Sequence, residues 1–217
     1  MTAGRAGGPS RYQPQAEDPP GTSRLFIAVP VAEAVRDAVG ALMEEVAGGP
    51  VDRRLPGQPR WVRVEGLHLT LRFLGATPDD RRAELVAAIS NAAAVTRPFR
   101  VVLSGGGAFP NQYRPRVLWI GIAEGGPELA ALERRVDAEL VRRGWSPDDR
   151  PFTAHLTLAR TDGVQGAADR ARHLIDAAED LELAWEADRL ILYKSNLGHG
   201  PTHYEAVATA RLGTGSP

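Results

Sequence analysis

The chain has 217 residues, enough for one substantial domain or two small packed lobes, and 43% of them are hydrophobic. It contains no cysteine, which excludes disulfides, thiolate metal ligands and a cysteine nucleophile and fits a cytoplasmic protein. The formal net charge of −1 argues against a protein that coats long nucleic acids by neutralising their phosphates.

Residues 1–22 are rich in glycine, proline and polar residues, and are predicted to form a disordered leader without a secretory signal. RLFIAVPV (24–31) predicts a buried strand, and a helix follows over AEAVRDAVGALMEEVAG. WVRVEGLHLTLRFLG (61–75) predicts one or two strands. Thr77 and Pro78 are the expected N-cap and first turn of a helix that continues to about Val95.

FRVVLSGGGAF (99–109) and RVLWIGI (116–122) predict two strands, with the three consecutive glycines at a bulge or turn rather than in a phosphate loop. A helix over GPELAALERRVDAELVRRG precedes the strand FTAHLTLAR (152–160), and residues 166–180 predict another helix. DRLILYKSNL and HYEAVATARL predict two closing strands, followed by a frayed tail at 213–217. No apolar run is long enough to span a membrane.

The order strand, helix, HLTL strand, helix, strand occurs nearly twice, which indicates an internal duplication. Residues 23–212 are therefore predicted to form a single domain of two related lobes. HLTL stands at 68–71 and at 155–158, in a chain with only five histidines. At ordinary composition, such a repeat would arise by chance in on the order of a few chains per thousand. The repeat therefore favours a functional role over coincidence.

Side chains on a strand alternate between its two faces. In the first copy, the face toward the core is predicted to carry Leu67, Leu69, Leu71 and Phe73. The opposite face would carry His68, Thr70 and Arg72, matched in the second copy by His155 and Thr157. Each strand thus presents an imidazole beside a hydroxyl on a rigid element, which is a sound way to build a site.

Two facing His–Thr pairs suit in-line displacement at phosphorus without a metal ion. Imidazole has an ordinary pKa of about 6.5, so one ring can accept a proton from the nucleophile while the other protonates the leaving oxygen. The threonine hydroxyls can donate hydrogen bonds to the phosphate oxygens. The expected pH dependence is bell-shaped around neutrality. Residues 50–116 hold eleven arginines against five acidic residues, so a phosphorylated chain end could be attracted locally.

The paired HxTx motifs resemble those of the two-histidine (2H) phosphoesterase superfamily. RLFIAVPV, LHLTLRFLG, PRVLWIGI, FTAHLTLAR and LYKSNLGHGPTHYEAV are similar to its RNA 2′,3′-cyclic phosphodiesterase branch, also called the 2′-5′ RNA ligase family, over about residues 24–212. The resemblance implies an α+β, bilobal, duplicated fold with two antiparallel sheets, flanking helices and a pseudo-twofold central cleft.

The resemblance also implies a reaction, the cofactor-free opening of an RNA terminal 2′,3′-cyclic phosphate to a 2′-phosphomonoester. His68 would be the proton donor and His155 the proton acceptor, while Thr70 and Thr157 would hold the phosphate. The residues themselves do not distinguish the two histidines. The implied partners are RNA 3′ ends or small nucleotides with a cyclic phosphate, and a monomer without membrane association is expected.

Further candidates are weaker on sequence grounds. Arg72 is a candidate phosphate ligand on the His68 face, whereas Arg160 reaches the cleft only at a strand end or beyond a bulge in its strand. The candidates for stacking on a base are Phe26, Trp61 and Tyr193, the last in a segment that also contains Ser195. His199 and His203 are four apart, off a helix and without nearby carboxylates, so no metal site is expected.

Three other functions stay open at this point. The same acid and base could act on small cyclic phosphates or on 2′-5′ linked oligonucleotides. Ligation of RNA through a 2′-5′ bond is related chemistry, but nothing in the sequence indicates nucleotide activation. A non-catalytic RNA-end-binding module is the third alternative, and the two imidazoles argue against it because binding alone does not require them.

Overall fold

The computed structural model describes residues 18–49, 51, 58–161, 164–196 and 203–213. In this part of the chain the strands form two antiparallel sheets. The first sheet has the order β3 (His68–Pro78), β1 (Thr22–Pro30), β8 (Arg189–Asn196) and β9 (His203–Arg211). The second has the order β2 (Arg60–Trp61), β6 (Leu156–Arg160), β5 (Val117–Glu124), β4 (Phe99–Phe109) and β7 (Leu183–Ala187).

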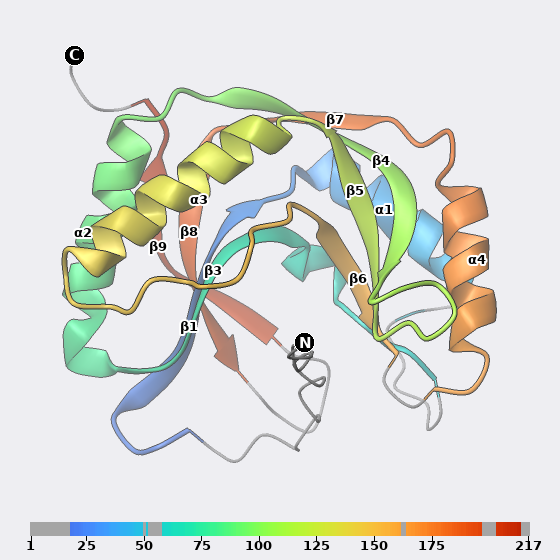
Figure 1. The fold of residues 1–217 in the computed structure, drawn as a ribbon, viewed down its shortest axis with the longest axis horizontal. Coiled ribbons are helices and arrows are strands. Elements are labelled where there is room, and N and C mark those ends of the chain that lie inside the picture. Colours follow the sequence, from blue (N-terminus) through green and yellow to red (C-terminus); the bar gives the residue numbers. More distant parts are fainter. Residues whose placement is uncertain (1–17, 50, 52–57, 162–163, 197–202, 214–217) are drawn as a thin grey trace, which may run out of the picture.

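Two helices cover each sheet. In each pair, one helix comes from the N-terminal half of the chain and the other from the C-terminal half. α2 (Arg82–Ala94) and α3 (Gly126–Val141) pack together against the first sheet. α1 (Glu33–Ala47) and α4 (Ala167–Ala177) pack together against the second (Figure 1). Thus α1 follows a strand of the first sheet but covers the second, and α3 follows a strand of the second but covers the first.

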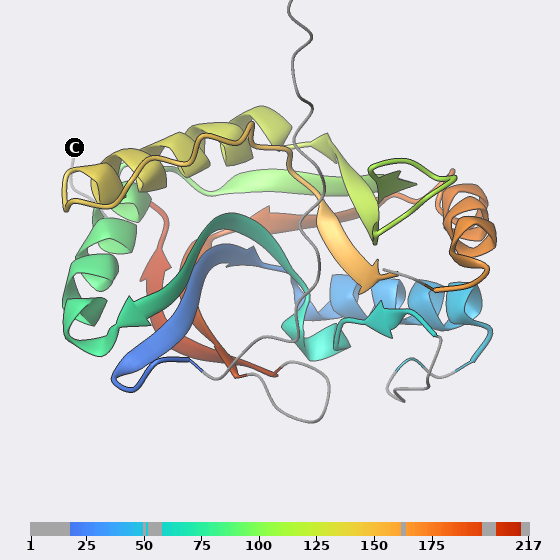
Figure 2. The same ribbon diagram turned by 60° about the horizontal axis from the view of Figure 1, so that its bottom comes forward.

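The strand order supports the predicted duplication. In the first sheet the HLTL strand β3 lies beside β1, and β8 from the second half of the chain comes next. In the second sheet the HLTL strand β6 lies beside β5, and β4 from the first half comes next. β3 and β6 contact each other, and they run along the facing sides of the two lobes (Figure 2). The two motifs therefore occupy equivalent positions around one cleft.

The leucines of both motifs anchor their strands in the core. Leu69 is 1% exposed, and Leu156 and Leu158 are fully buried. They belong to a continuous apolar cluster that includes the buried faces of all four α-helices. Burying an aliphatic side chain of this size stabilises the fold by about 1.5–3 kcal/mol. His68, Thr70, His155 and Thr157 are fixed by this packing on the opposite side.

A β-bulge interrupts each HLTL strand at its second leucine. In β3, Thr70 and Arg72 oppose consecutive residues of β1, so Leu71 is the extra residue. In β6, Thr157 and Ala159 oppose consecutive residues of β5, so Leu158 is the extra residue. A bulge makes two successive side chains point to the same side, which reverses the alternation beyond it.

The bulge in β3 overturns two expectations. Phe73 was expected in the core but is 55% exposed, because it lies beyond the bulge and faces the cleft. Arg72 was expected on the His68 face but is 7% exposed and points away from the cleft. The bulge in β6 has the converse effect, since it carries Arg160 to the cleft as that candidate required.

Other differences from the sequence expectations are local. Thr77 does not cap a helix: β3 continues to Pro78, a 3₁₀ turn covers Asp79–Arg81, and the Thr77 hydroxyl donates to the carbonyl of Gly75 at 3.2 Å. The short strand β7, in the second sheet, was not predicted. The glycines of β4 do form a bulge, between Ser104 and Gly106.

The two ends of the domain lie slightly beyond the expected boundaries. The Thr22 amide donates to the carbonyl of Pro19 at 3.1 Å, and the Gly213 amide donates to Ala93 at 3.1 Å. The last residues of the predicted leader and the first residue of the predicted tail thus form backbone hydrogen bonds, while the disorder of these segments stays a prediction. The rest of these two segments, 1–17 and 214–217, lies outside the described residues. Among the described helices, none has the length and apolarity to cross a membrane.

The glycines of β4 permit close packing, which predicts the effect of Gly106→Ala. A Cβ atom at Gly106 would lie 2.5 Å from the carbonyl oxygen of Leu174 in α4. Because backbone cannot move aside easily, we expect Gly106→Ala to lower the free energy of unfolding by about 1–3 kcal/mol, measured by denaturant titration. Gly126→Ala is the matched control, since no heavy atom other than those of its chain neighbours and its own helix backbone lies within 4 Å of its Cβ position. Equal stability of the two variants would contradict this packing.

Candidate active site

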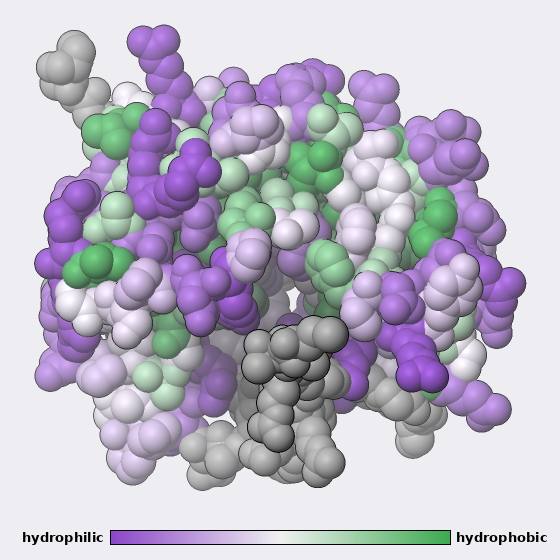
Figure 3. Space-filling view, viewed as in Figure 1, coloured by the Kyte–Doolittle hydropathy of each residue, from purple (hydrophilic) through white to green (hydrophobic). Residues whose placement is uncertain are grey.

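Two adjacent cavities lie between the lobes, and they share one wall. The first has a volume of about 280 Å³ and contains His68, while the second has about 340 Å³ and contains His155. Figure 3 shows the hollow between the lobes. The residues that line both cavities are Thr70, Phe73, Thr157 and Arg160. Two hydroxyls and a guanidinium are thus gathered between the two histidines.

Both imidazoles are oriented by the same local hydrogen bond. His68 Nδ1–H donates to the carbonyl of Gly66 at 2.6 Å, and His155 Nδ1–H donates to the carbonyl of Thr153 at 2.7 Å. In each case the acceptor lies two residues before the histidine. A carbonyl oxygen only accepts, so the proton of the neutral ring must be on Nδ1. Nε2 is left in both rings to accept a proton or, once protonated, to donate one.

His68 is enclosed by aromatic rings. Its ring centroid lies 4.7 Å from that of Phe26, 5.1 Å from Tyr204 and 5.9 Å from Tyr193. Burial disfavours the imidazolium and lowers the pKa of His68 to about 4, although the hydrogen bond to Gly66 acts in the opposite direction. The His68 ring is therefore neutral in the free protein near pH 7.

His155 has a more open environment, which distinguishes the two histidines. Its ring lies edge-on to Phe109 at 5.1 Å and is 6.4 Å from Trp119. Burial again lowers the pKa, the hydrogen bond to Thr153 raises it, and the positive charge of Arg160 lowers it further. The sequence offered no basis for this asymmetry, because both motifs have the same four letters.

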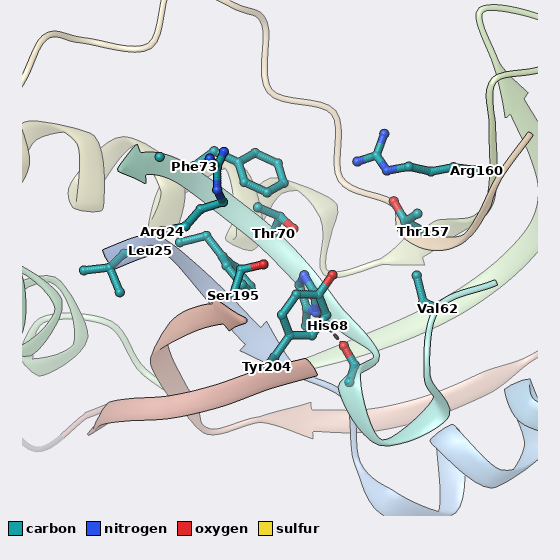
Figure 4. A pocket seen from close by; sticks show the side chains of 13 residues that line it. Arg24, Leu25, Val62, His68, Thr70, Phe73, Thr157, Arg160, Ser195 and Tyr204 are labelled. Carbon is teal, nitrogen blue, oxygen red and sulfur yellow. Dashed lines mark hydrogen bonds between the residues drawn. The ribbon is translucent and has the colours of Figure 1, made fainter. Parts of the chain in front are cut away.

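Arg160 occupies the centre of the site. It lines both cavities, and its charge lowers the pKa of His155 as well as that of Tyr204, although burial raises the pKa of Tyr204 overall. Figure 4 shows Arg160 and Thr157 across the first cavity from Thr70. A guanidinium in this place can neutralise a bound phosphate and donate two parallel hydrogen bonds to it.

The bulges make Phe73 and Arg160 equivalent in the two repeats. Each residue is the second after its bulged leucine, and each side chain turns into the cleft. The first motif therefore presents a flat apolar ring where the second presents a cation. This difference breaks the pseudo-twofold symmetry, so the cleft can orient a ligand that has one anionic and one apolar end.

Arg72 does not contribute to the cleft. Its Nη1 atom lies 3.3 Å from Asp137 Oδ1 and 3.1 Å from Asp148 Oδ2, and Nη2 donates to the carbonyl of Ser146. The proposed phosphate contact is therefore wrong, because the bulge directs the guanidinium into these ion pairs. Arg72 instead connects β3 to α3 and to the segment that leads to His155.

The three base-stacking candidates do not offer a free face. Phe26 lies in the wall of the first cavity but is only 3% exposed, because it packs beneath His68. Tyr193 stacks on Phe26 at 5.2 Å, and Trp61 packs against the core. The described lining of the two cavities includes neither Tyr193 nor Trp61.

Phe73 and Tyr204 are the aromatic side chains that sequence reasoning missed in the first cavity. A bulge in β3 would have revealed Phe73, but the sequence has no glycine or other signal at that position. Tyr204 follows His203 in a segment similar to the family, which was a weak signal. Ser195 also lines the cavity. Of the metal candidates, His199 lies outside the described residues, and no group of three potential ligands occurs among those described.

Several known proteins are similar to this chain in sequence or in fold. The model of the 2′-5′ RNA ligase superfamily matches residues 25–199. A Geobacillus stearothermophilus protein named RNA 2′,3′-cyclic phosphodiesterase is 32% identical over 190 residues, covering 88% of this chain but only 57% of that protein's length. A protein of the same name from Archaeoglobus fulgidus is 36% identical over 137 residues, covering 63% of this chain and 72% of its own. A solved structure from Thermus thermophilus has a TM-score of 0.68 and 28% identity, covering 89% of this chain and 100% of its own.

The enclosure of the histidines can be tested by NMR titration. We expect the Cε1–H resonance of His68 to titrate near pH 4 and that of His155 at a pH below 6.5. In urea-unfolded protein both should titrate near 6.5, because burial is removed. Inorganic phosphate should raise both pKa values, since a bound anion favours the imidazolium. A His68 pKa of 6.5 or above in the folded protein would contradict the enclosed environment.

Proposed function

Since the chain belongs to the 2′-5′ RNA ligase superfamily, we propose that it hydrolyses the terminal 2′,3′-cyclic phosphate of RNA to a 2′-phosphomonoester. The observation that carries this proposal is the wall shared by the two cavities. Thr70, Thr157 and Arg160 line it, and His68 and His155 lie in the cavities on either side. The names of the Geobacillus and Archaeoglobus relatives support the choice of substrate.

In this proposal the cyclic phosphate binds at the shared wall. The hydroxyls of Thr70 and Thr157 and the guanidinium of Arg160 donate hydrogen bonds to its non-bridging oxygens, each contributing about 1.5–3 kcal/mol with a charged acceptor. These donors are fixed by strands whose leucines are buried. Additional negative charge in the transition state is met by groups that need not rearrange.

His155 accepts a proton from water at Nε2, and the water oxygen forms a new bond to phosphorus. The bond from phosphorus to the ribose O3′ breaks in line, and protonated His68 gives its proton to that oxygen. The phosphate remains on O2′, and a proton passes from His155 to solvent while His68 takes one up. Atoms and charge balance without a further reactant, and each positioned proton transfer contributes about 10²–10⁴ in rate.

This assignment follows the family resemblance, and because burial lowers the pKa of His68 to about 4, the bound anion must supply the counter-charge for its protonated form. Aromatic side chains line both cavities: Phe73 and Tyr204 are accessible in that of His68, and Phe73, Phe109 and Phe152 line that of His155. The cavity of His155 is lined by the charged side chains of Glu133, Asp148 and Arg150, and water can approach the phosphate from that side. One chain carries all of these groups, so a monomer would suffice.

A chemical assay tests the proposal directly. We expect the protein to convert an oligoribonucleotide with a terminal 2′,3′-cyclic phosphate to the 2′-phosphomonoester in the presence of EDTA, identified by chromatography against the authentic 2′- and 3′-phosphates. His68→Ala and His155→Ala should each lower kcat by about 10²–10⁴, because each removes one proton transfer. A solvent-exposed histidine, His173→Ala, is the matched control and should retain full activity.

Two results would contradict the proposal. If folded wild-type protein leaves the cyclic phosphate intact, the chain is not this enzyme. If it binds the RNA end and its turnover is as low as that of both histidine variants, the chain is a binding module. Faster hydrolysis of 2′-5′ linked oligoadenylate than of the RNA end would support the small-substrate alternative.

The enclosed histidines also change the expected pH dependence. The kcat/KM profile reports the acid and the base of the free enzyme, and burial lowers both pKa values below 6.5. Activity requires one protonated and one neutral ring, so it falls at high pH as the acid loses its proton and at low pH as the base gains one. We therefore expect a bell with its maximum below pH 6.5 rather than around neutrality. The maximum of the kcat profile should lie at higher pH, because the bound anion raises the pKa of both histidines. A kcat/KM maximum above about pH 7 would contradict this mechanism.

A further inference from the structure

Arg24 lies at the end of the first cavity away from Arg160. It comes from β1 and lines the same cavity as His68, but it is absent from the described lining of the second cavity, where Arg160 recurs. Figure 4 shows Arg24 beside Phe73, on the other side of Thr70 from Arg160. The cavity therefore has a guanidinium at each end.

The geometry of β1 directs Arg24 to the cleft. Arg24 and Phe26 are two residues apart on this strand, so their side chains share a face. Phe26 packs against the ring of His68 at 4.7 Å. Phe26, which packs beneath His68, and Arg24 thus both belong to the face of β1 that is turned to the cleft.

Among the described residues, the guanidinium of Arg24 is only partly satisfied. Nη2 donates to Asp18 Oδ1 at 2.8 Å, and the two side chains are 28% and 21% exposed. Nε is buried, and within the described part of the chain it forms no hydrogen bond. A ligand cannot reach this buried atom, but the exposed part of the guanidinium lines the cavity and can donate charge-assisted hydrogen bonds to an anion there.

From this arrangement, and on the basis of the proposed function, we propose that Arg24 binds the phosphate on the 5′ side of the terminal nucleotide. The 3′-terminal nucleotide of an RNA carries two anions, the cyclic phosphate on one side of the ribose and the phosphodiester at C5′ on the other. Arg160 and Arg24 match these two charges, and Phe73 and Tyr204 line the same cavity. A nucleoside 2′,3′-cyclic phosphate lacks the second anion. The preferred substrates are therefore oligonucleotides and 5′-phosphorylated nucleotides.

The alternative is that Arg24 only fastens residues before β1 through Asp18. The two roles differ in what removal of Asp18 does. If Arg24 acts through the ion pair, Asp18→Asn and Arg24→Met should have the same effect. If Arg24 binds phosphate, Asp18→Asn should retain or strengthen the preference for a 5′-phosphate, since a competing carboxylate is removed.

The test compares three substrates: adenosine 2′,3′-cyclic phosphate, its 5′-phosphorylated form, and an adenosine dinucleotide ending in the cyclic phosphate. We expect wild-type kcat/KM to be roughly 10-fold to 100-fold higher for the last two, as for one charge-assisted interaction. Arg24→Met should reduce this ratio to about 1, mainly through KM, and leave the first substrate unaffected. Arg100→Met is the matched control, since Arg100 also pairs with a carboxylate, Glu124 at 3.2 Å, but does not line either cavity.

Binding of products gives a readout that does not depend on turnover. Calorimetry should show that wild-type protein binds adenosine 2′,5′-bisphosphate more tightly than adenosine 2′-monophosphate, and that Arg24→Met binds both equally. Equal affinities in the wild type, or an equal loss for all substrates in Arg24→Met, would overturn the role of Arg24. Absence of hydrolysis of all three substrates would instead contradict the proposed function, while the binding comparison would still decide on Arg24.

Discussion

The chemistry of the cleft depends on one irregularity that both repeats share, the β-bulge at the second leucine of HLTL. Before the bulge, regular alternation buries the leucines and turns His and Thr toward the cleft. After it, the alternation reverses, which brings Phe73 and Arg160 into the site and sends Arg72 into ion pairs with Asp137 and Asp148. Without the bulges the cleft would have an arginine beside His68 and lack the one beside His155. The bulges therefore determine the position of positive charge, and with it the end at which a phosphate can bind.

The enclosure of His68 shows how the fold prepares a weakly basic ring. Packing among Phe26, Tyr193 and Tyr204 stabilises the domain but disfavours the imidazolium. Gly66 permits this packing, because a Cβ atom there would lie 2.9 Å from the Tyr204 ring while its carbonyl orients His68. A histidine with a low pKa is a strong acid once protonated, and a bound phosphate supplies the counter-charge. The same contacts thus serve stability, ring orientation and acidity.

The fold class and the central residues of the site could be predicted from the sequence, because they depend on local periodicity and on repetition. The repeated HLTL motif predicted a strand in each half, the side chains on its core and cleft faces, and a pair of facing His–Thr sites. The spacing of apolar residues predicted the helices. The orientations of Phe73, Arg72 and Arg160 could not be predicted in the same way. They depend on bulges, which are set by pairing with β1 and β5 rather than by the sequence of the bulged strand. The asymmetry between His68 and His155 was also beyond the motif, because it arises from aromatic residues on β1, β8 and β9 in one lobe and on β4 and β5 in the other.

The exchange of α1 and α3 between the sheets has a consequence for how the two lobes can be separated. A cut in the segment between β4 and β5 would leave an N-terminal fragment with two strands of each sheet and one of the two helices that cover each. The C-terminal fragment would hold the remaining strands and helices of both layers. Neither fragment could bury its own apolar surface, but the two together hold every element of the described fold. Each half of the chain therefore contributes to both lobes, and the lobes are not two independent units joined by a hinge. The distance between His68 and His155 is thus fixed when the whole domain folds.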